Sequence, residues 1–494
     1  MPSKPRTSLA THYLRYALGN VLMIGAGFVS FPITTRLLSN EQFGVLSYWE
    51  AGLLLLVAVV KLGGGDAIVR FYPHGGDGSA LSRYATNFIV LPALVSLGVW
   101  LLAVAAGGLA ASAGWLDAPT IALVAIAQAL PLVWGGFVLR AMQAREQSGL
   151  NTVVSVLWRW LIVAATLTML LLVQASATSV LIGRLLAHLL VAGVLLVWLL
   201  RNIEWWWRDR DLKYAREGMS YGAPLAMMEV SNILLAYIDR VMLKWLVGDF
   251  ASVGIYSIGY ALASYVDQLI STALNQALGP VVNRVYAQDG AAGVRALKAR
   301  VLTPLVYLCA GLGAGVLMVG RDFLAWLASA DKAGSAPVFM LLGVAFLVRP
   351  ILYTAGEGLL LEKRSGTVFA VTAGAAVANV LLNLVLIPRF GFMGAAYACC
   401  VCVLGRQYLL YRFCPADLRV LPSGRVVAIA LGLALACLGV ASATDLFGLQ
   451  GPFARLLAAT GLLLAGYAVP VLLLDGDIRR TLLRLRSGAA QGAS

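Results

Sequence analysis

The stretch RLLSNEQFGVLSY, Arg36–Tyr48, recurs as KWLVGDFASVGIYSI, Lys244–Ile258. Each copy joins the end of one apolar run to the start of the next through a short polar turn. Two further pairs of segments follow in the same order: VRFYPHG from Val69 with NRVYAQDG from Asn283, and AREQSG, Ala144–Gly149, with EKRSG, Glu362–Gly366. The offsets are 210 to 217 residues, so the sequence predicts an internal duplication. Each copy covers six of the membrane spans predicted below, an even number, so both copies have the same orientation.

The amino-acid composition indicates whether the chain folds in water or in a lipid bilayer. Of its 494 residues 60% are hydrophobic and 12% are charged, with a mean hydropathy of +0.85. Soluble globular proteins carry roughly 25% charged residues, so this chain is predicted to be an integral membrane protein. The same numbers exclude a disordered chain or a small disulfide scaffold, and the six cysteines are interpreted as small buried hydrophobic residues.

Apolar runs of about 20 residues are long enough to cross a bilayer as helices. Closing each run at a polar or Gly/Pro cluster gives fourteen predicted spans. They cover 14–36, 44–62, 86–112, 119–140, 150–173, 177–200, 220–245, 252–278, 301–319, 337–359, 367–387, 393–411, 425–443 and 454–474.

The basic residues orient these spans. Of the 37 Lys and Arg residues, 27 fall in the alternate segments that include both termini and six in the opposite set. Because cytoplasmic loops collect positive charge, both termini are predicted to be cytoplasmic. The net charge of +14 therefore indicates membrane topology and not a nucleic-acid partner.

The duplication and the span count together predict an all-α polytopic membrane protein with two pseudo-symmetric six-helix lobes and two extra helices. The predicted parts are an N-terminal lobe at 1–200, an interfacial linker at 201–219, a C-terminal lobe at 220–412, and two extra helices with a basic tail at 413–494. The linker contains three consecutive tryptophans, which are typical of the headgroup region of a membrane.

Three stretches carry a family resemblance: ITTRLLSNEQFGVLSYWEA, LGGGDAIVRFYP and YIDRVMLKWLVGDFASVGIYSIGYALA. With the 6+6+2 pattern, they resemble the Wzx-type lipid-linked oligosaccharide flippases, the polysaccharide transporters of the MATE-like MOP exporter superfamily. The resemblance implies a V-shaped pair of lobes around a central cavity. It also implies translocation of undecaprenyl-diphosphate-linked sugar units to the outer leaflet of the inner membrane, for surface polysaccharides such as O-antigen. Membrane lipids and other polysaccharide assembly proteins are the expected partners.

Charged side chains inside the bilayer cost about 2.5–3.5 kcal/mol each on insertion scales and are expected to face a cavity or a partner. Four arginines lie inside predicted spans and are assigned to the phosphates of the substrate, because a guanidinium pairs with phosphate in a bidentate fashion: Arg159, Arg184, Arg240 and Arg349. Three acidic residues are candidates for coupling transport to a H⁺ or Na⁺ gradient: Glu229, Asp239 and Asp267. No cofactor and no metal site are expected.

Structural interpretations of the same residues remain open. Asp239 and Arg240 are adjacent and could pair with each other or with neighbours as interhelical contacts. His188 fits an interhelical hydrogen bond better than a proton relay. Glu357 lies near the cytoplasmic end of its predicted span, where it could simply be solvated.

Three functions are compatible with such a chain. A flippase working by alternating access fits the basic intramembrane residues. A MATE-like cation-coupled multidrug exporter is the alternative, but it calls for an acidic, aromatic cavity. A membrane-embedded enzyme such as a sugar polymerase needs large outer loops, and the longest predicted one spans only 320–336, so no enzymatic activity is expected.

Overall fold

The computed structural model describes residues 9–61, 63–74, 77–443, 448–449, 451–476 and 478–479. Within these ranges every regular element is a helix, and no strand occurs. Twelve of the helices are long and apolar enough to cross a membrane. The protein is therefore an all-helical, multi-pass membrane protein, as its composition predicts. The tail residues beyond 479 and the first eight residues lie outside the described part of the chain.

All fourteen predicted spans coincide with helical segments, although the count of fourteen remains a prediction. The seventh and eighth spans, 220–245 and 252–278, are helical but are not among the twelve. Both carry a stripe of polar side chains, which lowers their hydropathy. The segment between the eighth and ninth spans is also helical, because its charged residues reduce hydropathy without opposing helix formation.

The chain divides into two compact units, Met1–Ser257 and Ile258–Ser494. The first unit therefore includes the seventh predicted span, which the sequence repeat assigns to the second lobe, since that helix packs against α2 and α3. The elements of the first unit are α1 (Leu9–Leu37), α2 (Asn40–Lys61), α3 (Gly64–Arg70), α4 (Gly78–Ala85), the π-helix η1 (Thr86–Val90), α5 (Leu91–Ser112), α6 (Pro119–Ala144), α7 (Ser148–Leu172), α8 (Ala177–Asn202), the short η2 (Trp207–Asp209), α9 (Leu212–Val247) and the start of α10 (Phe250–Leu327).

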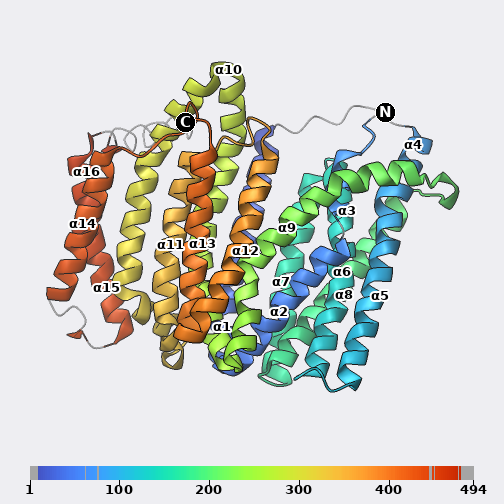
Figure 1. The fold of residues 1–494 in the computed structure, drawn as a ribbon, viewed down its shortest axis with the longest axis horizontal. Coiled ribbons are helices and arrows are strands. Elements are labelled where there is room, and N and C mark those ends of the chain that lie inside the picture. The colour runs from blue at the N-terminus through green and yellow to red at the C-terminus, as the bar shows by residue number, and fades with distance from the viewer. Residues whose placement is uncertain are drawn as a thin grey trace, which may run out of the picture. The chain divides into compact units, whose positions relative to one another are not determined.

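Within the first unit, α6 packs on α2, α5 and α8, and α7 packs on α1 and α8 (Figure 1). Polar caps set several helix starts: Asp77 accepts a hydrogen bond from the backbone N–H of Ala80, and Ser176 accepts one from Ser179. Gly248, at φ 90°, ends α9 in the left-handed conformation that favours glycine. Side-chain caps therefore mark where α4 and α8 begin, and a left-handed glycine marks where α9 ends.

The duplicated turn forms a close contact between α2 and the start of α10. A methyl group on Gly44 would collide with the backbone carbonyl oxygen of Phe250, and one on Gly254 would collide with that of Asn40. Gly44 and Gly254 occupy matching positions of the repeat, and so do Asn40 and Phe250. The two copies of the turn therefore pack backbone to backbone in a pseudo-symmetric arrangement that only glycine permits.

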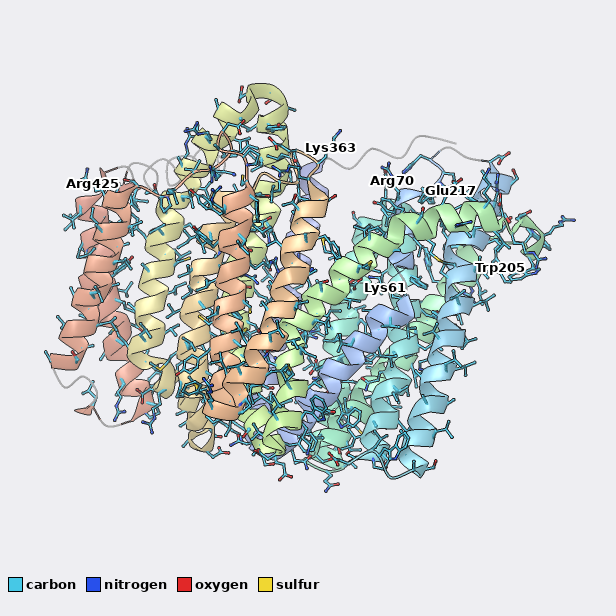
Figure 2. The ribbon with its side chains drawn as sticks, viewed as in Figure 1. Lys61, Arg70, Trp205, Glu217, Lys363 and Arg425 are labelled. Carbon is cyan, nitrogen blue, oxygen red and sulfur yellow. The ribbon has the colours of Figure 1, made fainter. Side chains whose placement is uncertain are left out.

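The linker that precedes α9 is tied to the end of the first unit. The side chain of Asn87 donates to the carbonyl oxygen of Asp209 over 3.0 Å and accepts from the backbone N–H of Asp211 over 2.8 Å. The Arg83 guanidinium, hydrogen-bonded to Asp211, holds the pKa of that carboxyl below its usual range. These contacts leave Trp205, Trp206 and Trp207 exposed, as a segment at the headgroup level requires. Figure 2 shows Glu217 and Arg70 at the same end of this unit.

The second unit contains the rest of α10, η3 (Ala330–Ser335), α11 (Ala336–Gly356), α12 (Ser365–Phe390), α13 (Phe392–Phe413), α14 (Gly424–Ala443), α15 (Pro452–Leu463), the π-helix η5 (Leu464–Ala468) and α16 (Val469–Leu474). Helix α13 packs between α11 and α12. The long α10 departs from helical geometry at Gly290 and Val319. Lys363 and Arg425 lie at one end of this unit (Figure 2).

The buried Lys298 joins three segments at that end of the second unit. Its ammonium donates to the carbonyl oxygen of Leu418 over 2.9 Å and to that of Glu357. The side chain is only 2% exposed, so a large part of its cost of burial is offset by these two bonds. Lys298 therefore links α10 to the end of α11 and to the chain that leads into α14.

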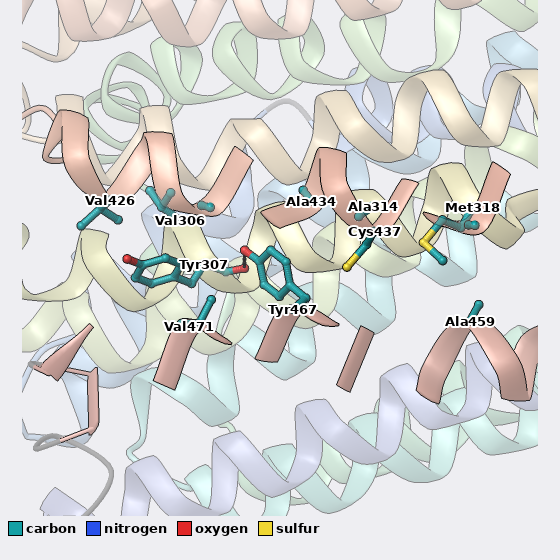
Figure 3. Close-up of a cluster of buried hydrophobic side chains, with 12 residues drawn as sticks. Val306, Tyr307, Ala314, Met318, Val426, Ala434, Cys437, Ala459, Tyr467 and Val471 are labelled. Atoms are coloured by element: carbon teal, nitrogen blue, oxygen red, sulfur yellow. Dashed lines mark hydrogen bonds between the residues drawn. The ribbon is translucent and has the colours of Figure 1, made fainter. Parts of the chain in front are cut away.

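The two extra helical segments pack on α10 through a buried apolar cluster (Figure 3). Two tyrosines tie this contact: the Tyr467 hydroxyl donates to the carbonyl oxygen of Tyr307 over 2.7 Å, and the Tyr307 hydroxyl donates to the Asp475 carboxylate over 3.0 Å. At the other end, Arg455 pairs with Asp322 over 3.0 Å. The extra segments are thus an integral part of the second unit.

The substitution Tyr467→Phe tests this packing. It removes one buried hydrogen bond and leaves the Tyr307 carbonyl without its Tyr467 donor, so we expect a loss of about 1–3 kcal/mol in the stability of the purified protein. Thermal unfolding in detergent measures the effect. The matched control is Tyr408→Phe, since the Tyr408 side chain is 57% exposed and its loss is expected to leave the melting temperature unchanged.

Candidate functional site

An ion pair lies within the helices of the first unit. Arg184 of α8 contacts the Glu50 carboxylate of α2 over 3.2 Å, with side-chain exposures of 24% and 40%. Arg184 is assigned to phosphate binding from the sequence, whereas Glu50 is missing from the predicted intramembrane acids although it lies inside the predicted span 44–62. The structure corrects this omission: an acid from a different helix faces Arg184.

Two more arginines surround this pair. Arg159 of α7 and Arg240 of α9 lie close enough for their charges to act on Glu50, and Tyr237 interacts with the same group of charges. Arg159 is exposed and makes no ion pair or hydrogen bond with the described part of the chain. We call Glu50, Arg159, Arg184, Arg240 and Tyr237 the first-unit cluster. Its three guanidinium groups outnumber its one carboxylate, so the cluster carries an excess of positive charge.

Asp239 and Arg240 share a tyrosine. The Tyr256 hydroxyl donates to the Asp239 carboxylate, which is 0% exposed. Arg240 donates to the carbonyl oxygen of Ala236 over 2.7 Å and lies 4.8 Å from the centre of the Tyr237 ring. The Tyr256 ring also faces Arg240, at 5.7 Å. In this conformation the contacts favour the structural interpretation of Asp239, and its role in ion coupling remains untested.

A cavity of about 490 Å³ with charged residues in its lining lies in the first unit, between α2, α3, α6 and α9. Glu229 lines it and pairs with Lys61 over 2.8 Å, while Arg140 and Asp66 pair across it over 3.7 Å. Tyr237 lines the cavity and also belongs to the first-unit cluster. The cavity and the cluster therefore meet at Tyr237.

The second unit has a comparable pair. Arg349 of α11 binds the Asp267 carboxylate of α10, and the Ser271 hydroxyl donates to the other oxygen of that carboxylate over 2.9 Å. Arg349 remains 36% exposed while Asp267 is 9% exposed. Arg406 of α13 is near enough for its charge to act on Arg349. We call Asp267, Arg349 and Arg406 the second-unit cluster, and here too guanidinium groups outnumber carboxylates.

Two smaller predictions are confirmed by contacts. The Trp158 indole donates to Nδ1 of His188 over 3.0 Å, so His188 makes the predicted interhelical hydrogen bond, between α7 and α8. Five of the six cysteines are buried, and all six are unbridged. Glu357, considered solvated in one interpretation, accepts instead from the Tyr353 hydroxyl over 3.3 Å and is partly buried.

Comparison with known proteins assigns the family. Residues 11–285 match the model of the family described as Polysaccharide biosynthesis protein, which is more than half of the chain. The chain belongs to this family. It is similar, at 21% identity over 397 residues, to a probable low-salt glycan biosynthesis flippase of Haloferax volcanii, covering 79% of this chain and 80% of that one.

Solved structures identify the fold. The structure is similar to the lipid II flippase MurJ in an inward closed conformation, with a TM-score of 0.75 and 13% identity over 95% of this chain and 99% of that one. It is also similar to a multidrug resistance MATE family transporter of the MOP superfamily in an inward-facing conformation, with a TM-score of 0.62 and 14% identity over 81% and 97% of the two chains. The fold is therefore that of the MurJ and MATE transporters, as the sequence predicts.

Proposed function

We propose that this protein flips undecaprenyl-diphosphate-linked oligosaccharide units from the cytoplasmic to the outer leaflet of the inner membrane. It does so by alternating access, coupled to a H⁺ or Na⁺ gradient and with both termini in the cytoplasm. The observation that carries the proposal is the excess of guanidinium groups in the first-unit cluster. Membership of a polysaccharide biosynthesis family supports the choice of a glycan cargo.

The chemistry of the cargo explains the arginines. A lipid-linked diphosphate brings at least two negative charges into a region of low dielectric constant, where bidentate guanidinium contacts are strong. Arg159, Arg184 and Arg240 supply these contacts in the first unit, and Arg349 supplies them in the second. Glu229, Asp239 and Asp267 are the proposed ion-coupling residues, and Asp267 is the best placed because it already holds a substrate-binding arginine.

Reconstitution tests the proposal. Purified protein in liposomes is supplied with a fluorescent undecaprenyl-diphosphate-linked glycan on one side, and quenching from the other side measures transfer. We expect transfer that depends on the diphosphate and accelerates under a H⁺ or Na⁺ gradient. Transport of a cationic dye without glycan transfer would instead support the multidrug exporter, whose fold this chain also shares.

A further inference from the structure

In each unit one intramembrane arginine contacts a carboxylate, and the two carboxylates lie on helices that match each other in the repeat. Glu50 lies six residues after Gly44, on the second helix of the first copy of the repeat, and Asp267 lies thirteen residues after Gly254, on the second helix of the second copy. The difference of seven residues corresponds to two turns at 3.6 residues per turn, so both acids lie on the same face of their helices. Their partners differ: Arg184 comes from α8 and Arg349 from α11.

At least one arginine faces each of these two carboxylates. Glu50 faces Arg184 from α8, Arg159 from α7, and Arg240 and Tyr237 from α9. Asp267 faces Arg349 from α11, the Ser271 hydroxyl and the thiol of Cys309 on α10 itself. In each case a carboxylate occupies the guanidinium face that a phosphate would use.

This arrangement makes carboxylate and phosphate competitors for the same donors. Each carboxylate already contacts its guanidinium through one nitrogen, Nη1 of Arg184 and Nη2 of Arg349, so a phosphate that pairs with the same guanidinium competes with it. A carboxylate displaced from its arginine by a diphosphate loses an ion-pair partner and lies beside added negative charge, and both changes favour binding of a proton. Binding of the diphosphate and binding of a proton then favour each other, because the two processes are thermodynamically linked.

We propose that Glu50 and Asp267 hold Arg184 and Arg349 while the site is empty, and that an incoming lipid diphosphate displaces each carboxylate, which takes up a proton from water. This inference rests on the proposed function, since it assumes a diphosphate cargo. It adds Glu50 to the residues that control binding and gives Asp267 a defined role.

Calorimetric titration with farnesyl diphosphate, a short isoprenoid diphosphate, tests the inference on the full-length protein. Titrations in two buffers of different ionisation enthalpy give the number of protons taken up on binding. In the double variant Glu50→Gln/Asp267→Asn these two side chains cannot take up a proton, so binding reports only the protonation change of the ligand. The wild type is therefore expected to take up about one to two more protons per bound ligand than the double variant at pH 7. The wild-type affinity is expected to rise as the pH falls, whereas the affinity of the double variant stays nearly flat.

The single variants make the expectation sharper. Glu50→Gln removes a competitor and keeps a hydrogen-bonding side chain of the same size, so it is expected to bind farnesyl diphosphate about tenfold more tightly at pH 7.5. The control is Asp322→Asn, which breaks an arginine–carboxylate pair of the same kind outside both clusters and is expected to change neither affinity nor proton uptake.

The outcomes separate two failures. Weaker or unchanged binding in Glu50→Gln, or equal proton uptake by the wild type and the double variant, overturns the inference while leaving a diphosphate cargo intact. If the variants do not fold, the pH dependence of the wild type is sufficient as a test. A wild-type affinity for farnesyl diphosphate that does not rise as the pH falls overturns the inference. No binding of farnesyl diphosphate to the wild type at any pH overturns the proposed function itself.

Discussion

Replacing Arg159 and Arg184 together by alanine is expected to abolish export of the surface polysaccharide. Each guanidinium contributes a charge-assisted contact to phosphate, worth about 1.5–3 kcal/mol, so losing both weakens substrate capture by about 100-fold or more. The loss of Arg184 also leaves Glu50 to repel the incoming anion. The measurements are export in cells that lack the wild-type protein and farnesyl diphosphate affinity in vitro.

The single variants separate charge from fold. Arg159→Ala is expected to weaken binding about tenfold without lowering the melting temperature, because Arg159 makes no ion pair or hydrogen bond within the described residues. Arg455→Ala is the control, since it removes a guanidinium that pairs with Asp322 outside both clusters. Export that persists in the Arg159→Ala/Arg184→Ala protein would show that these arginines do not capture the cargo.

The second large effect is expected at the repeated turn. Gly44→Ala places a methyl group against the Phe250 carbonyl oxygen, and backbone cannot move aside as a flexible side chain can. We expect a loss of about 2–3 kcal/mol in stability and a lower yield of monodisperse protein. Thermal unfolding and size-exclusion chromatography measure both.

The control for this prediction lies on the same helix. Gly52 is exposed, and a methyl group there would meet no heavy atom within 4 Å. Because alanine favours helix over glycine by about 1 kcal/mol, Gly52→Ala is expected to stabilise the protein slightly. The two substitutions are chemically identical and should change stability in opposite directions. Equal effects would mean that the close contact at Gly44 does not form.

The sequence predicts the helices well because the length of an apolar run is a local property. The predicted span 119–140 corresponds to α6, Pro119–Ala144, and 177–200 corresponds to α8, Ala177–Asn202. The family and the fold also follow from local motifs.

The partners of the charged residues could not be predicted, because they depend on which helices pack together. Glu50 stands alone in an otherwise apolar run, and only the approach of α8 shows that it faces Arg184. Lys61 lies at the end of its predicted span, where the sequence indicates no partner, yet it pairs with Glu229 of α9. The useful signal is an unmatched arginine inside a predicted span, which calls for a search of all other spans for an acid.

The contact between Gly44 and Phe250 determines when the first unit can finish folding during synthesis. The two matching glycines are 210 residues apart, so α2 enters the bilayer long before its partner has been synthesised. During that interval the backbone of α2 around Gly44 lacks its contact with Phe250. The first unit therefore completes its folding only after the ribosome has translated the start of the second copy of the repeat.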